Sequence, residues 1–259
     1  AASVRSGRNH EYGISVTDPK TFRRSLLMTE KIHRYGAACS IEINHAGMFA
    51  PPQFNNGRLA FAASDCDTSN WTRSTFSYTI MNEEMMDEVA NDYAEAVMTL
   101  RNLGFDMTMI HMGNGWLFTQ FLSPRTNNRT DKYGGNLENR CRFPLMVLER
   151  IREKVGYDYP LEMRLTADEL TENGIKIDEA IEMAKIFQPY VNMIQTVTGS
   201  LQLKRNIDIA SSGYTERARN VVYTREFKKH LQIPISTVGS SFKSVQQMED
   251  FIANGDLDV

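Results

Sequence analysis

The sequence is poor in cysteine and contains no long apolar run. Its three cysteines, Cys39, Cys66 and Cys141, are odd in number and widely spaced, which favours reduced thiols over a disulfide framework or a zinc site. No segment approaches the roughly 18 consecutive apolar residues of a membrane span, and the first residues lack the apolar core of a signal peptide. We therefore expect a cytoplasmic location, no metal site and no membrane partner.

An excess of either charge is also lacking. The chain carries 29 Lys and Arg residues against 32 Asp and Glu residues, for a formal net charge of −3. Because both signs are mixed along the chain, no basic face stands out to bind nucleic acid or an anionic membrane. The composition favours an enzyme that acts on a small molecule, and its 259 residues suit a single barrel domain of about 250 residues.

Short apolar strands alternate with amphipathic helices along the chain. The first helix begins with Asp18 as N-cap and Pro19 at the first helical position, and Gly36 ends it. The predicted helices cover residues 19–35, 82–102, 142–155, 178–187 and 223–230, and the predicted strands cover residues 39–44, 106–111, 161–166, 191–196 and 233–238. This alternation predicts an α/β fold of parallel strands with helical crossovers, either closed into a barrel or doubly wound.

A polar, glycine-broken segment, residues 110–143, follows one of these strands. It reads IHMGNGWLFTQFLSPRTNNRTDKYGGNLENRCRF. In α/β barrels, the loops that leave the carboxyl ends of the strands build the active site, so we expect His111 and Asn114 to face a ligand. They lie three residues apart, so both side chains can turn towards one acceptor atom and stabilise negative charge there as an oxyanion hole.

The FLSPxxNxRTDxYGGxxENRxRF pattern in this segment resembles the signature of the Old Yellow Enzyme family of FMN-dependent ene-reductases, in which a His-x-x-Asn pair stands just upstream. The resemblance spans nearly the whole chain and implies one FMN-binding domain, residues 1–259, with the (β/α)8 TIM-barrel fold. It implies that NAD(P)H reduces an activated C=C bond of an α,β-unsaturated carbonyl, such as an enoyl-CoA or a steroid or bile-acid enone. His111 and Asn114 would then bind the carbonyl oxygen.

The resemblance also assigns residues to the cofactor. Arg164 matches the arginine that lies against the flavin ring, and Gly239 and Ser240 match the phosphate-binding loop after the seventh strand. Glu42 stands where the family has a glutamine that contacts the flavin pyrimidine, although an ionised carboxylate accepts hydrogen bonds and cannot donate them. The alternative for Arg164 is an ion pair inside the barrel, with Glu42 or Glu162.

At Trp116 the sequence departs from the family, which commonly has a tyrosine whose phenol protonates the α-carbon. Indole has a donor N–H but no accessible pKa, so the proton must come from water or another side chain, for example Tyr78 or Tyr214. The alternative is a packing change that only shapes the pocket. Both tyrosines belong to long irregular segments, residues 48–81 and 197–222, which we expect to lie over the mouth of the barrel.

The number of strands is small for a barrel of eight. Five complete strands are followed by the start of a sixth at residues 257–259, which predicts an incomplete barrel of about strands 3 to 8, truncated at both ends. In the resembling family, a branch of larger enzymes carries a 4Fe-4S cluster and an FAD domain after the barrel. We therefore expect these two cofactors only in a longer parent chain. A homo-oligomer is compatible with these features. Two rival hypotheses stay open: a non-catalytic or degenerate barrel that binds flavin or another ligand, and a barrel for a different phosphorylated ligand.

Overall fold

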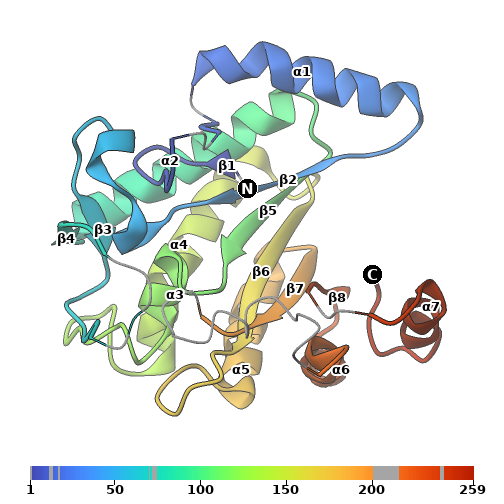
Figure 1. Cartoon of the computed structure of the whole chain (residues 1–259). Coiled ribbons are helices and arrows are strands. Elements are labelled where there is room, and N and C mark those ends of the chain that lie inside the picture. Colours follow the sequence, from blue (N-terminus) through green and yellow to red (C-terminus); the bar gives the residue numbers. More distant parts are fainter. Residues whose placement is uncertain are drawn as a thin grey trace.

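One parallel sheet forms the centre of the molecule. The structure is a computed structural model that describes residues 2–11, 14–16, 18–69, 71, 75–200, 216–239 and 242–259. The strands lie in the order β1-β2-β5-β6-β7-β8 (Figure 1). Their bounds are β1 (Ala2–Ser3), β2 (Ser40–Asn44), β5 (Met107–Met112), β6 (Leu161–Asp168), β7 (Met193–Thr198) and β8 (Ile235–Thr237). All neighbouring pairs are parallel, so each connection crosses over to bring the chain back to the same edge.

Helices make these crossovers. They are α1 (Pro19–Arg34), α2 (Glu83–Asn102), α3 (Leu117–Leu122), α4 (Leu137–Val155), α5 (Ile177–Phe187), α6 (Arg219–His230) and α7 (Val245–Ala253). The predicted start of α1 is confirmed, because the Asp18 carboxylate accepts a hydrogen bond from the Lys20 N–H at 3.0 Å and Pro19 occupies the first turn. Helices α2, α4, α5 and α6 pack side by side in chain order, which matches the outer ring of a barrel.

The (β/α)8 TIM-barrel prediction is confirmed as part of such a barrel, but the position of the sixth strand was wrong. Residues 257–259 are not a strand. The Asp258 N–H donates to Ile235 O at 2.8 Å and the Asp258 carboxylate accepts from the Ile235 N–H at 2.8 Å, so the side chain takes the bond that a strand backbone would make. The sixth strand is β1, whose two residues are too few to show a pattern.

Two helices were not predicted, and the predicted start of a third helix lay too far along the sequence. Helix α3 lies inside the segment that was expected to be loop, and α7 follows the last predicted strand. Helix α4 begins at Leu137 rather than at residue 142, because the Asn136 side chain caps it by accepting from the Asn139 N–H at 2.9 Å. The first turn of α4 is polar, so apolar spacing gave no signal for it.

The segment of residues 48–81 is less irregular than expected where the structure describes it. It contains the 3-10 turn Pro52–Phe54 and a two-stranded sheet of β3 (Ala60–Ala62) and β4 (Tyr78–Ile80). Residues 201–215, within the second long segment, lie outside the described residues. In the part of the chain that the structure describes, none of the helices has the length and apolarity needed to cross a membrane.

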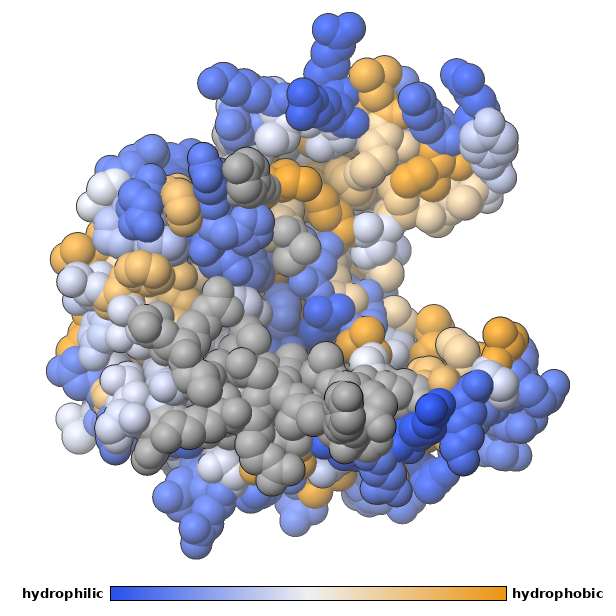
Figure 2. All heavy atoms as spheres, in the orientation of Figure 1, coloured by the Kyte–Doolittle hydropathy of each residue, from blue (hydrophilic) through white to orange (hydrophobic). Residues whose placement is uncertain are grey.

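The molecule is hollowed between α1 and α7 (Figure 2). Apolar side chains stay exposed on both helices that border this hollow. They are Leu26, Leu27 and Met28 of α1 and Val245, Met248 and Ile252 of α7. Thr29 is the one buried residue of α1, so this helix is attached to the rest of the molecule through few contacts.

Candidate active site

One face of the sheet is polar. The strand register places His111 of β5 beside Arg164 of β6, and Arg164 beside Gln195 of β7. Laterally paired residues project from the same face of a sheet, so these side chains form a row across three strands. Glu42 and Glu162 lie on the same face, nearer the amino ends of their strands, since both are in register with one residue of β5. The opposite face is apolar and is buried under the helices.

Arg164 is held by two partners in this row. Its Nη1 pairs with Glu42 Oε2, and its Nε donates to Gln195 Oε1 at 2.7 Å. The structure thus shows an ion pair of Arg164 with Glu42, and the contact of Arg164 with the flavin stays a prediction. The Arg164 and Glu42 side chains are 19% and 18% exposed, so solvent, or a ligand in its place, reaches them, whereas His111 and Glu162 on the same face are buried. A guanidinium beside an amide at an accessible edge fits the polar rim of an isoalloxazine ring.

His111 is neutral and has one defined donor. Burial, and then the charge of Arg164, hold the pKa of His111 well below its usual range. Its Nδ1 accepts a hydrogen bond from the Gly113 N–H at 3.1 Å. A neutral imidazole with an accepting Nδ1 carries its proton on Nε2, so the ring offers an N–H donor at Nε2.

Asn114 follows the end of β5 in a left-handed backbone conformation, with φ 56°, which asparagine adopts more readily than most residues. Its N–H donates to Thr166 Oγ1 at 2.8 Å. Its amide Nδ2 donates to Thr198 O at 3.1 Å and to Gly199 O at 3.5 Å. The structure thus ties the Asn114 amide to the end of β7, and a ligand oxygen would have to replace the longer of these two bonds.

Aromatic side chains form a wall next to His111. The Trp116 ring stands edge-on to His111 with ring centroids 6.4 Å apart, and edge-on to Phe49 at 6.1 Å. Trp71 packs against Phe49 in turn, with centroids 5.8 Å apart. Trp116 is buried and belongs to the same apolar cluster as residues from the 48–81 segment. That segment therefore lies against the site, as expected for a loop over the barrel mouth.

Of the two tyrosines predicted as proton donors, the structure describes Tyr78 alone, which packs against the apolar cluster that contains Trp116. The Tyr78 hydroxyl donates to Asp65 Oδ1 at 2.8 Å, and burial, followed by that hydrogen bond, raises the pKa of Tyr78 to about 12. Such a phenol is a poor acid at neutral pH. Tyr214 lies outside the described residues. Neither tyrosine is therefore identified as the proton donor that would replace the tyrosine of the resembling family.

The structure describes one of the two residues that were predicted to bind the phosphate. Gly239 follows β8 at the carboxyl edge of the sheet and has φ 73°, a left-handed conformation that leaves glycine free to place its N–H towards a ligand. Ser240 lies outside the described residues. Nearby, the Asn220 side chain donates to Val238 O at 2.8 Å, which joins the start of α6 to the same edge.

The sequence reasoning missed Gln195 and considered Glu162 only as a partner of Arg164. Gln195 is partly buried and follows the apolar Ile194 in β7, which was the available signal. Glu162 is 3% exposed, and its Oε1 accepts a hydrogen bond from Ser236 Oγ at 3.5 Å. Burial raises the pKa of Glu162 to about 7, against the lowering effects of Arg164 and Ser236. A carboxyl group that titrates near neutrality inside the barrel is a feature of functional sites.

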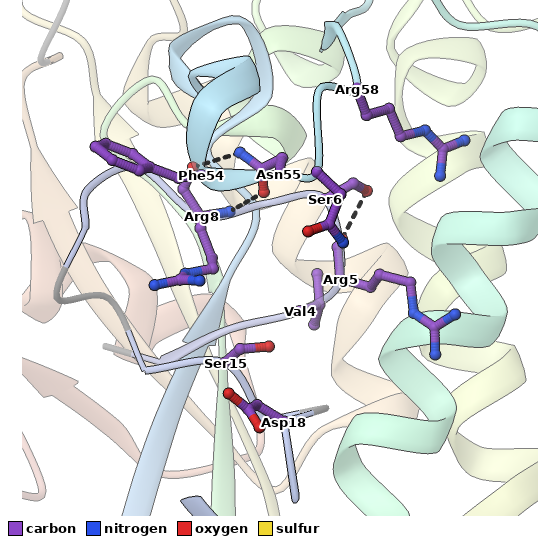
Figure 3. A pocket seen from close by; sticks show the side chains of 10 residues that line it. Val4, Arg5, Ser6, Arg8, Ser15, Asp18, Phe54, Asn55 and Arg58 are labelled. Carbon is purple, nitrogen blue, oxygen red and sulfur yellow. Dashed lines mark hydrogen bonds between the residues drawn. The ribbon is translucent and has the colours of Figure 1, made fainter. Parts of the chain in front are cut away.

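A separate cavity of about 550 Å3 lies beside the carboxyl ends of β1 and β2 (Figure 3). Three arginines line it, and each has a partner. Arg58 pairs with Glu88 at 2.5 Å, Arg5 pairs with Asp92 at 3.7 Å, and the Arg8 Nη2 donates to Glu11 O at 2.6 Å. Carboxylates of α2 therefore balance Arg5 and Arg58, whereas Arg8 is bound to a backbone carbonyl oxygen.

Arginines of the later signature segment join separate elements of the fold. Arg129 donates to Ala63 O and to Met81 O, each at 2.8 Å, and so ties the signature loop to the ends of β3 and β4. Arg140 is buried, pairs with Glu179 of α5 and donates to the last residue of α3. These bonds join elements that are far apart in the chain, so the polar residues of this segment help to hold the fold together.

Comparison with known proteins identifies one family. The model of the NADH:flavin oxidoreductase / NADH oxidase family matches residues 1–259. An NADH oxidase of Thermoanaerobacter brockii is 32% identical over 252 residues, which cover 97% of this chain and 38% of that protein. An NADPH dehydrogenase of Bacillus cytotoxicus is 30% identical over 180 residues, 69% of this chain and 49% of that protein. The chain thus spans half or less of these relatives.

Solved structures agree on the fold. A 2-naphthoyl-CoA reductase in complex with 2-naphthoyl-CoA superposes with a TM-score of 0.88 at 23% identity, over 100% of this chain and 41% of that one. An Old Yellow Enzyme homologue from Zymomonas mobilis gives a TM-score of 0.80 at 18% identity, over 100% of this chain and 72% of that one. The family binds FMN and uses NAD(P)H. From its signature, its fold and the match along all 259 residues, the chain belongs to the NADH:flavin oxidoreductase / NADH oxidase family.

Proposed function

We propose that the protein reduces the activated C=C bond of an α,β-unsaturated carbonyl compound with NAD(P)H, with FMN as the bound cofactor. One observation carries the proposal: a neutral histidine with its donor on Nε2 stands in register beside an accessible arginine at the carboxyl end of adjacent strands. Arg164, Glu42 and Gln195 would hold the flavin, and Gly239 and Ser240 its phosphate. When bound, FMN supplies the hydride that it takes from NAD(P)H.

His111 would act on the substrate. As negative charge develops on the carbonyl oxygen, the Nε2–H donates a hydrogen bond to it. A donor fixed before the reaction stabilises this charge without reorganisation and contributes roughly 2.7–4 kcal/mol. Asn114 would add a second donor by exchanging its long bond to Gly199 O, at 3.5 Å, for one to the substrate.

Trp116 would shape the pocket and would not supply the proton that the α-carbon of the substrate needs. Its indole N–H does not ionise at neutral pH. Together with Phe49 it presents an apolar wall to the ligand, which excludes water around the polar row and strengthens the electrostatic interactions there. The proton at the α-carbon would come from water or from another side chain.

The rival hypothesis is that the barrel binds flavin but does not catalyse the reduction of a substrate. It is favoured by the Asn114 amide, both of whose hydrogens are already engaged by backbone oxygens, and by the negative charge of Glu42 next to the cation of the site. Both features weaken the binding of an electron-rich ligand.

Anaerobic spectroscopy tests the two functions. The visible spectrum of the protein is recorded with FMN, after addition of NADH, and after addition of a cyclic enone. Bleaching by NADH followed by recovery of the oxidised spectrum with the enone supports the proposal. Bleaching without recovery across a panel of enones supports the rival, and a protein that takes up no FMN contradicts both.

A further inference from the structure

We propose that His33, Cys39 and Asp106 form a binding site for a borderline-soft divalent metal ion of the Zn2+ class, at the edge of the sheet opposite the active site. His33 lies in the last turn of α1, Cys39 immediately before β2 and Asp106 immediately before β5. The His33 Nε2 lies 2.8 Å from Asp106 Oδ2 and 4.0 Å from Cys39 Sγ. The potential ligand atoms of all three residues lie within 4.8 Å of one another.

The donor set selects the kind of ion. A thiolate, an imidazole nitrogen and a carboxylate oxygen are ligands of Zn2+ and related transition metals, whereas Mg2+ and Ca2+ prefer oxygen alone. Tetrahedral Zn2+ holds its ligand atoms about 3.4–3.6 Å apart, given bonds of about 2.3 Å to sulfur and about 2.1 Å to nitrogen and oxygen. The two observed separations, 2.8 Å and 4.0 Å, lie on either side of this range, so small side-chain rotations suffice.

The arrangement differs from that of a cysteine nucleophile. In a nucleophile, base and orienting acid, the two ring nitrogens of the histidine face different partners. Here the same atom, His33 Nε2, faces both Cys39 and Asp106, so the three groups surround one point. The Cys39 N–H also donates to Asp106 Oδ2 at 2.7 Å, which fixes the carboxylate in the way that outer partners orient metal ligands.

The position indicates a structural role. Asp106 and His111 lie five residues apart along β5, about 16 Å at about 3.3 Å per residue, so the ion would be remote from the proposed chemistry. Helix α1 buries Thr29, whose hydroxyl donates to Leu103 O at 2.7 Å. A metal ion would add a second attachment near the end of the same helix, and would join it to the starts of two strands.

No pattern along the chain indicated this site, because its members come from three separate segments. Residues 33, 39 and 106 do not form a spaced motif of the kind that identifies zinc sites. The odd, scattered cysteines predicted no zinc, and only the pairing of β2 with β5 brings Cys39 next to Asp106.

Cobalt titration tests the proposal on the full chain after treatment with a chelator. We expect one equivalent of Co2+ to bind with a dissociation constant of about 10 μM or tighter, with a sulfur-to-cobalt charge-transfer band that Zn2+ abolishes by displacement. Cys39→Ser should remove the band and His33→Ala should weaken binding at least tenfold. Cys66→Ser is the matched control, since it also removes a partly buried thiol, and it should bind as the wild type does.

A second measurement separates a lost site from a misfolded variant. Zn2+ at 100 times its dissociation constant should raise the Tm of the wild type by about 5 °C and leave that of Cys39→Ser unchanged, while both keep the same circular dichroism spectrum. Absence of a charge-transfer band in the wild type, or cobalt binding that survives Cys39→Ser and His33→Ala, would overturn the proposal.

Discussion

At the scale of single residues, the candidate site depends on charge states that its neighbours impose. His111 is kept neutral by burial and by Arg164, and Arg164 is paired with Glu42. Burial raises the pKa of Glu162 to about 7. Neither this pKa nor the pairing of Arg164 follows from the residue type alone, because a glutamate in water is ionised at neutral pH and an arginine there is unpaired.

Replacement of His111 should affect the second half of the reaction alone. We expect His111→Ala to lower the rate of enone reduction by about 10²–10³-fold, because one preorganised donor is lost, while flavin reduction by NADH keeps its rate. His111→Asn retains an N–H donor, so its rate of enone reduction should lie between those of the wild type and His111→Ala. Stopped-flow measurement of both half-reactions provides the test, and an unchanged oxidative rate in His111→Ala would show that His111 does not bind the carbonyl.

Glu42 should set the reduction potential of the flavin. Its charge offsets that of Arg164, and Arg164 would otherwise stabilise the reduced, anionic form. Glu42→Gln should therefore raise the midpoint potential by about 30 mV or more, equivalent to ~1.4 kcal/mol for a two-electron couple. Spectroelectrochemical titration measures the shift. The exposed acid Glu84 supplies the control variant, Glu84→Gln, and equal potentials in both variants would contradict the assignment.

Glu162 should make folding stability depend on pH. Its pKa rises from 4.5 to about 7 on folding, so between these values the native state binds more protons than the unfolded state. Stability should therefore fall as pH rises from about 4.5 to about 7 and level off above, by a total of about 2–4 kcal/mol. Urea unfolding at several pH values measures the slope, and Glu162→Gln should flatten it. A slope that persists in the variant would assign the effect to other groups.

At the scale of elements, the short helix α3 connects the signature segment to the turn after β2. All six of its residues are buried. Gln120 donates to Gly115 O at 3.0 Å and accepts from the Met48 N–H at 3.4 Å. Gly47 makes this approach feasible, since a Cβ atom there would overlap the Gln120 side chain.

Two glycine substitutions separate backbone strain from overlap. Gly47 and Gly57 both have positive φ, at 59° and 78°, but a Cβ at Gly57 would meet nothing within 4 Å. Gly57→Ala should cost about 1–2 kcal/mol for the left-handed conformation. Gly47→Ala should cost at least about 1 kcal/mol more, because α3 must move. Urea unfolding gives both values, and equal losses would mean that Gln120 adapts freely.

At the scale of the whole molecule, the sheet of six parallel strands has one polar face. A hollow lies between α1 and α7, and both helices expose apolar residues (Figure 2). Exposed apolar residues gathered on two facing helices mark a surface that tends to associate. Single exposed apolar residues elsewhere need no such account.

Polar substitution on these helices should therefore reduce association. Leu27→Lys with Met248→Lys, one change at an exposed apolar residue on each of α1 and α7, should lower both the fluorescence of a bound apolar dye and the tendency to self-associate in analytical ultracentrifugation. Tyr35→Lys, at an exposed residue beyond the end of α1, is the control and should change neither. Unchanged association in the double variant would place the contact on another surface.

Much of the fold was determined by the sequence alone. Alternating strands and helices, and the cap of α1 at Asp18, are local patterns that follow from the period of apolar residues and from backbone hydrogen bonding. The signature indicated the family and singled out His111 and Arg164. Short or polar elements such as β1 and α3 gave no pattern and were missed.

The tertiary structure decided what the candidate residues contact. That Arg164 pairs with Glu42, that the Asn114 amide is tied to β7, and that Cys39 and Asp106 lie together all depend on strands that are distant in the chain. Local sequence determines the conformation of a segment because its forces act over a few residues. The partners and charge states of buried polar groups depend on which strands pair and how deeply they are buried, and the folded sheet determines both.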